Sequence, residues 1–191
     1  MADMKASALL IAAPLTGAEF WAAVQSGDDR KVTAEQIAAY VAQRCGRVVH
    51  QSAAQQSFTG TTAETVLATI LVPGGLMGPN GSLRITTSWT LTSSANGKTM
   101  RVRFGGSTIQ ANTATTASYY RMQCEIHNVN SEAIQSSTAI SASGFGAGGA
   151  SPTATTQDTT DDVEITLVGT LSNAGETLTL ESYLVEVMPS L

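Results

Sequence analysis

The clearest alternation of hydrophobic and polar residues in this chain runs from Ser82 to Thr92. A period of two is typical of a β-strand with one face buried and the other in water. The hydroxyl-rich phase is expected to face outward, and the apolar phase is expected to form part of a core. Trp89 is therefore predicted to be a core residue and not a ring that stacks on a ligand. The apolar phase holds Leu83, Ile85, Thr87, Trp89 and Leu91.

The same period recurs along the C-terminal two thirds of the chain, between turn signals such as Asn80-Gly81. The last segment changes phase between Leu180 and Tyr183, which predicts a β-bulge or a strand covered on both faces. About eight antiparallel strands, with no helical pattern among them, predict a mainly β protein with a jelly-roll-like sandwich. The glycine-rich residues 144–157 are typical of a flexible loop. The predicted strands cover residues 64–72, 82–92, 98–104, 118–129, 133–143, 163–171 and 177–188.

One helix is predicted before the sandwich. Thr33 and Gln36 have the spacing of a capping box, and apolar residues follow at helical spacing. A short helix is therefore expected over about residues 33–44, ending before Gly46. Residues 18–25 are expected to form either a short strand or one helical turn. A helix of this length is only marginally stable alone in water, so it needs a packing partner.

The chain is expected to divide into an N-terminal segment, residues 1–52, and a β-sandwich, residues 53–191. Residues 48–60 are rich in Gln, Ser and Ala and are predicted to be a linker or an arm. The N-terminal segment is too small to bury its own large apolar residues. Either the sandwich or a different protein must cover them. The residues concerned are Phe20, Trp21, Ile37 and Tyr40.

The composition narrows the classes of partner. Of the 191 residues only 13% are charged, and the formal net charge is -5. Such a chain lacks the clustered Lys and Arg of a broad nucleic-acid surface, so a protein surface or a neutral glycan is the expected partner. No apolar run reaches the length of about 20 residues that crosses a membrane, and the N-terminal apolar run lacks the features of a secretory signal. Membrane insertion is therefore not expected.

Candidate catalytic and metal-binding residues are few. The histidines, His50 and His127, and the cysteines, Cys45 and Cys124, do not have the spacing of a zinc site. Cys124 lies on the apolar phase of a predicted strand, which favours a buried thiol over a disulfide. The sequence contains no G-x-S-x-G nucleophile motif. We therefore expect neither an enzyme nor a bound cofactor.

Three surface features leave alternatives open. An acidic cluster either holds Ca²⁺ through its oxygen atoms or is a solvated turn. Four arginines either form a basic patch or are ordinary exposed residues of a sheet. Tyr119, on the polar phase of its strand, is a candidate to stack on a sugar ring. The acidic residues are Asp158, Asp161, Asp162 and Glu164, and the arginines are Arg84, Arg101, Arg103 and Arg121.

Two stretches of the sequence have recognisable patterns. Residues 14–41 follow the pattern L-T-G-x-E … V-Q-G-G-x-x-x-K-V-T … I, from which Phe20 and Ser26 depart mildly. This pattern resembles a short N-terminal module of tailed-bacteriophage virion proteins, chiefly tail-fibre and head-fibre-like appendages. Residues 81–106 and 174–187 resemble a phage structural β-domain that follows such modules. The matching residues of the first stretch are Leu15, Thr16, Gly17, Glu19, Val24, Gln25, Gly27, Lys31, Val32, Thr33 and Ile37.

The resemblance implies a non-catalytic structural protein of the virion, assembled in the host cytoplasm. It would be a head fibre, a decoration protein or a small tail fibre. Its N-terminal segment would dock on other virion proteins, and its sandwich would project outward as a homotrimer. The alternative is a lectin-like module that binds a host surface glycan, with Tyr119 as a contact. The anchoring contacts would be Leu15, Phe20, Trp21, Ile37 and Tyr40.

Overall fold

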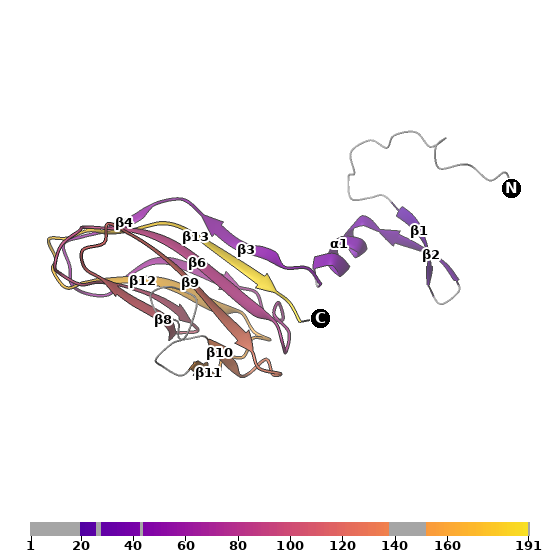
Figure 1. The fold of residues 1–191 in the computed structure, drawn as a ribbon. Helices are drawn as coiled ribbons and strands as arrows, with labels where there is room; N and C mark the ends of the chain where they lie inside the picture. Colours follow the sequence, from indigo (N-terminus) through magenta and orange to yellow (C-terminus); the bar gives the residue numbers. More distant parts are fainter. Residues whose placement is uncertain (1–19, 26–27, 43, 138–151, 191) are drawn as a thin grey trace, which may run out of the picture. The chain divides into compact units, whose positions relative to one another are not determined.

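The computed structural model describes residues 20–25, 28–42, 44–137 and 152–190 (Figure 1). The chain forms two compact units, residues 1–43 and residues 44–191. Each unit is described by itself below.

In the described residues of the first unit, a β-hairpin is followed by a helix. Strand β1 (Phe20–Gln25) pairs antiparallel with β2 (Asp28–Thr33), so the strand alternative is confirmed for these residues. Helix α1 (Ala34–Ala42) begins directly after Thr33. The capping box is confirmed in both directions. The Thr33 amide donates to Gln36 Oε1 at 2.9 Å, and the Gln36 amide donates to Thr33 Oγ1 at 3.1 Å.

The second unit is a sandwich of a seven-stranded and a four-stranded antiparallel sheet. The larger sheet has the order β11-β10-β9-β6-β13-β3, with β4 also paired to β13. Its strands are β3 (Arg47–Ser52), β4 (Gln56–Phe58), β6 (Ser82–Leu91), β9 (Tyr119–Asn128), β10 (Gln135–Ser137), β11 (Thr153–Thr155) and β13 (Leu178–Met188). The smaller sheet has the order β5-β12-β7-β8, from β5 (Thr65–Val72), β12 (Val163–Leu171), β7 (Lys98–Phe104) and β8 (Ser107–Ala114).

This strand order confirms the jelly-roll prediction. Two four-stranded blocks, β3/β4-β13-β6-β9 and β5-β12-β7-β8, face each other, and the chain crosses between them as in a double Greek key. Strands β10 and β11 extend the first block at its β9 edge. The predicted phase slip is also confirmed as a bulge, because the pairing of β13 with β6 shifts register between Leu180 and Ser182.

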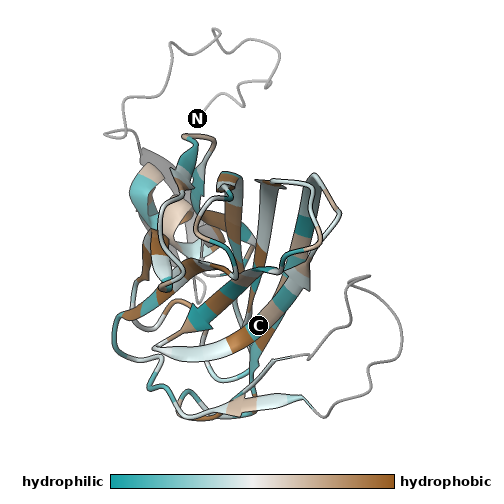
Figure 2. Ribbon diagram, turned by 90° about the vertical axis from the view of Figure 1, so that its left-hand side faces the viewer, coloured by the Kyte–Doolittle hydropathy of each residue, from teal (hydrophilic) through white to brown (hydrophobic). Residues whose placement is uncertain are grey.

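The core lies between the two sheets and is built from the predicted apolar phases. Trp89 is fully buried, and its indole Nε1 donates to Oγ1 of the buried Thr87 at 2.7 Å. This bond explains why a threonine occupies an inward position of an otherwise apolar strand, since a buried indole N–H needs an acceptor. Hydrophobic and hydrophilic residues alternate along the strands (Figure 2). The prediction that Trp89 packs in the core is confirmed.

The predicted linker is wrong. Residues 47–52 and 56–58 form β3 and β4, which both pair with β13. The unit boundary accordingly falls after residue 43 and not after residue 52. Strand β3 lies at a sheet edge, and the half-buried Val49 packs against the core. Because an edge strand needs few apolar residues, its sequence resembles that of a linker.

Strands β8 and β11 were also not predicted. β8 carries one large apolar residue, Ile109, and β11 has only three residues, so neither has a readable period. β11 lies within the predicted glycine-rich loop, of which residues 144–151 are outside the described part of the chain. Of the predicted strand over 133–143, Gln135–Ser137 form β10, and residues 138–143 lie outside the described part of the chain.

Both cysteines are free thiols. Cys124 is buried, as predicted, and burial raises the pKa of its thiol to about 12. Cys45 is exposed. Within the described residues, no helix has the length and apolar character needed to cross a membrane.

Candidate functional site

The predicted anchoring residues of the helix are exposed, as is every residue from Glu35 to Val41. Ile37 is 42% exposed, Tyr40 is 60% exposed and Val41 is 47% exposed. Spacings of three and four place these three side chains on one face of α1. We call them the helix face. Burying three such side chains against a partner is worth about 1.5–3 kcal/mol each before the costs of association.

The other predicted anchoring residues are only partly located. Phe20 and Trp21 begin β1, opposite Thr33 and Val32 of β2. Their side chains and all of Leu15 lie outside the described part of the structure. The backbone therefore places Phe20 and Trp21 beside the start of α1, in the same small unit as the helix face.

The sandwich has two distinct ends. At one end β3 begins and β13 ends, with Arg47 opposite Val187, and Val187 opposite Leu83 near the start of β6. We call this the joining end, because the chain enters the sandwich there from the first unit. At the other end, which we call the far end, Tyr119 starts β9 opposite Thr90. Thr90 lies seven positions after Leu83 along β6, so the two ends are about 23 Å apart.

A buried ion pair ties together the loops of the far end. Lys98 is fully buried, and its Nζ lies 3.3 Å from Oε2 of Glu176, whose side chain is 6% exposed. Lys98 Nζ also donates to Ser94 Oγ at 2.8 Å, to the Asn96 carbonyl at 2.8 Å and to the Thr115 carbonyl at 2.9 Å. These partners belong to three different strand connections, β6–β7, β8–β9 and β12–β13.

Glu176 completes this network from the β12–β13 turn. Its Oε1 accepts from Ser94 Oγ and from Asn96 Nδ2, the latter at 2.9 Å. The Ser94 hydroxyl, then the Asn96 amide and then Lys98 lower the pKa of the Glu176 carboxyl, and desolvation opposes them. The carboxylate is therefore held charged beside the lysine. The pairing of Lys98 with Glu176 is not predicted from the sequence, although a lysine on the apolar phase of β7 is a visible signal of it.

Tyr119 lies on the outer face of the larger sheet and is 55% exposed. Its hydroxyl is 3.2 Å from Ser88 Oγ on the neighbouring strand. Trp89 is buried on the opposite face of the sheet and cannot join Tyr119 in a stacking site. Among the described residues of the far end, Tyr119 is the exposed aromatic ring, and the Ser88 hydroxyl lies beside it.

The four arginines do not form one basic patch. Arg84 lies on the larger sheet, where its Nε donates to Glu125 Oε1 at 2.8 Å, which raises the pKa of the guanidinium. Arg101 and Arg103 lie on the smaller sheet and share Glu64, at 3.4 Å and 2.8 Å. The outer faces of the two sheets point away from each other. Arg84 on one face, and Arg101 and Arg103 on the other, are therefore on opposite sides of the sandwich, and each forms an ion pair with a glutamate. Arg121 lies on the same sheet as Arg84.

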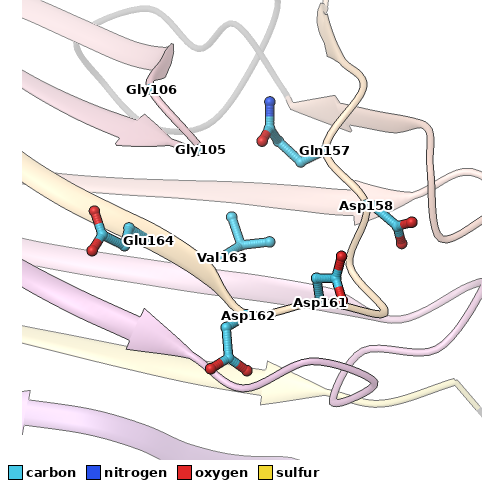
Figure 3. A pocket seen from close by; sticks show the side chains of 8 residues that line it. All are labelled: Gly105, Gly106, Gln157, Asp158, Asp161, Asp162, Val163 and Glu164. Atoms are coloured by element: carbon cyan, nitrogen blue, oxygen red, sulfur yellow. The ribbon is translucent and has the colours of Figure 1, made fainter.

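The acidic cluster lines an open hollow of about 400 Å³ between the β7–β8 turn and the loop before β12 (Figure 3). Two of its carboxylates accept hydrogen bonds from neighbouring residues. Asp158 Oδ1 accepts from the hydroxyl and the amide of Thr160, and these bonds lower the Asp158 pKa. Asp162 Oδ1 accepts from the Gly74 amide at 2.8 Å. Asp158, Asp162 and Glu164 point in different directions (Figure 3). No group of three or more metal-ligating residues occurs among the residues that the structure describes.

The two histidines belong to separate strands. His50 on β3 stacks on Tyr183 with ring centroids 5.5 Å apart. His127 Nε2 on β9 lies 3.6 Å from Glu125 Oε2. Strands β6 and β13 separate β9 from β3, which corresponds to about 14 Å. The structure therefore does not bring the histidines together.

Comparison with known proteins does not identify a family. No family model matches the chain, and no curated protein matches it. Among solved structures, the chain is similar to dimeric latent PorU from Porphyromonas gingivalis, with a TM-score of 0.41 and 13% identity over 76% of this chain and 13% of that one. It is also similar to the structure of infectious bursal disease virus, Gx strain, with a TM-score of 0.35 and 12% identity over 87% of this chain and 37% of that one. Likenesses this distant carry no argument about function.

Proposed function

We propose that this chain is a structural protein of a tailed-phage particle, docked through residues 1–43, with the sandwich projecting from the particle. The observation that carries the proposal is the helix face: Ile37, Tyr40 and Val41 are exposed on a nine-residue helix. A helix of nine residues is only marginally stable from its own hydrogen bonds, so it needs further stabilisation from packing of its apolar face. Such a face is typical of a surface that a partner covers.

The layout of the sandwich supports this proposal. The chain leaves the first unit and enters the sandwich at the joining end. The far end lies about 23 Å away along β6, and a buried ion pair fixes its loops. A domain tethered at one end with a rigid opposite end is suited to project from a surface. The resemblance of residues 14–41 to phage docking modules supports a phage particle as this surface.

Removing residues 1–43 is expected to leave a folded sandwich that no longer joins particles. The truncated chain should retain the far-ultraviolet circular dichroism of a β protein, because the core cluster lies wholly within residues 58–187. Incorporation is measured by purifying particles from cells that express the variant in place of the native chain. The double substitution Ile37→Ser and Tyr40→Ser in the full chain should reduce incorporation at least tenfold, and Tyr119→Ala should not. Normal incorporation of the truncated chain would contradict the docking role.

A second function, binding of a neutral glycan at the far end, is favoured by the exposed ring of Tyr119. An exposed aromatic face can pack against the C–H groups of a sugar ring; for comparison, stacking of a nucleic-acid base on an aromatic residue is worth about 1–3 kcal/mol. Tyr119→Ala is therefore expected to reduce adsorption of particles to host cells about tenfold, whereas Tyr119→Phe, which keeps the ring, should retain most of it. Incorporation into particles serves as the control. Equal adsorption of both variants and the native protein would exclude a role for this ring.

A further inference from the structure

Strand β5 is an edge strand without the features that normally prevent edge pairing. Within the described residues it pairs only with β12, so its other side carries free backbone groups. Its eight residues, TVLATILV, include no charge and no proline. Val66 is 56% exposed and Leu71 is 53% exposed, both on the outer face of the sheet.

The other edges of the sandwich differ from β5. β3 carries Arg47 and His50, and β11 has only three residues. β8 is as long as β5, but its large apolar residue Ile109 is buried, and the Ile109 carbonyl already accepts from Ser137 Oγ at 3.5 Å. Charge, shortness and cover are the usual ways of blocking an edge. β5 shows none of them.

We propose that β5 pairs with β5 of a second copy of this chain, joining the two four-stranded sheets into one continuous sheet. The register shift in β5 falls between Val66 and Ala68, so residues 68–72 form its regular part. A two-fold axis at Ile70 pairs this part with itself in antiparallel fashion. Opposed residues in this pairing differ in number by zero, two or four. Side chains on the core side therefore meet side chains on the core side, and outer side chains meet outer side chains.

The resulting cross-strand pairs are compatible on both faces. On the core side, Ile70 meets Ile70 of the second copy, and Ala68 meets Val72 of the second copy. These residues are buried or partly buried on the core side of the sheet. On the outer face, Leu71 meets Thr69 of the second copy. No charge opposes another at any of the five positions, because the strand has none.

A second copy is the occupant that these observations favour over an unrelated strand. The pairing is self-complementary, and every chain in solution carries the same strand, so the partner is always available at the concentration of the protein itself. The pairing closes at two copies. It is therefore distinct from the homotrimer that the resemblance implies, and it does not depend on the proposed function.

The mass of the full chain in solution tests this pairing, measured by sedimentation equilibrium over a concentration series. The native chain is expected to reach twice the chain mass, and Leu71→Lys is expected to stay at the mass of one chain, because a lysine at the edge opposes pairing. Leu184→Lys is the matched control: Leu184 points outward on β13, which has strands on both sides, so this variant should still form dimers. Thr69→Lys is a second variant that places a charge on β5. Circular dichroism checks that each variant is folded. A native chain that remains at one chain mass, a mass of three or more chains, or a dimer unaffected by both edge variants would overturn the proposal.

The register is tested separately by disulfide formation in a Cys45→Ser background, where the remaining Cys124 is buried. A disulfide needs Cβ atoms about 4 Å apart, which directly opposed residues approach and diagonal neighbours do not. Chains with Thr69→Cys mixed with chains with Leu71→Cys should form disulfide-linked pairs, and Leu71→Cys alone should not. Equal cross-linking in both samples would overturn the register centred on Ile70.

Discussion

Replacing Lys98 with methionine is expected to lower the free energy of unfolding of the sandwich by about 3–5 kcal/mol, the usual cost of breaking a buried ion pair by removing one partner. Lys98 is fully buried, and its ammonium makes three hydrogen bonds and one ion pair at the far end. The variant leaves the Glu176 carboxylate without its cation and the Asn96 carbonyl without the lysine donor, whereas the Thr115 carbonyl still accepts from the Ser94 amide at 3.3 Å. Since whole domains are stable by about 5–15 kcal/mol, the loss is a large fraction of the total. Urea unfolding followed by circular dichroism measures it.

The double variant Lys98→Met and Glu176→Gln is the control for this prediction. It removes both charges, so it should be more stable than Lys98→Met alone. A loss below about 1 kcal/mol for Lys98→Met would match an exposed ion pair and would contradict the buried network.

The same network sets the response to acid. The pKa of Glu176 is lowered in the folded chain, chiefly by the Ser94 hydroxyl. A group whose folded pKa is depressed contributes stability above its unfolded pKa, near 4.3, and loses that contribution as the pH falls through the folded value. As the pH falls below about 4.3, the loss of stability should therefore be smaller in Glu176→Gln than in the native chain, as measured by urea unfolding at a series of pH values.

Replacing Trp89 with alanine is expected to cost about 3–5 kcal/mol, the range for removing a large aromatic residue from a core. Trp89 is fully buried on β6, which lies between β9 and β13 in the larger sheet. The substitution opens a cavity between the two sheets and leaves the buried hydroxyl of Thr87 without the indole N–H. Chemical denaturation followed by circular dichroism measures the change.

Two variants on the same strand separate packing from hydrogen bonding. Thr87→Val removes the acceptor of the indole N–H while keeping the volume, and is expected to cost about 1–3 kcal/mol. Thr86→Ala, on the outward phase, should cost less than about 1 kcal/mol. A larger loss for Thr86→Ala than for Trp89→Ala would mean that the faces of β6 are assigned the wrong way round.

Predictions from sequence succeeded where one strand or turn contains its own signal. β6 has five inward positions that alternate with outward ones, and Thr33 and Gln36 form a capping box three residues apart. Both patterns are complete within a short stretch of sequence. Prediction failed for β3 and β8, whose identity depends on the strands beside them. β3 is a strand because β13 offers it a backbone to pair with, and residues 47–52 do not show that partner.

The candidate sites divide in the same way. The exposure of Ile37 and Tyr40 followed from a helix too short to bury them, and the exposure of Tyr119 followed from its phase. The pairing of Lys98 with Glu176, by contrast, joins turns distant in sequence; Ser94 and Glu176 are 82 positions apart. A lysine on an apolar phase signals that a partner exists, but it does not say which residue that partner is.

The sequence by itself determined which segments are extended, which face of each strand is apolar and where the helix begins, because these properties depend on neighbours within a few residues. Only the tertiary structure decided that β3 and β4 belong to the sandwich, that the arginines lie on opposite faces, and that β5 has an open edge. Each of these depends on which strands lie side by side, and strand order is set by contacts between segments that are far apart in the chain.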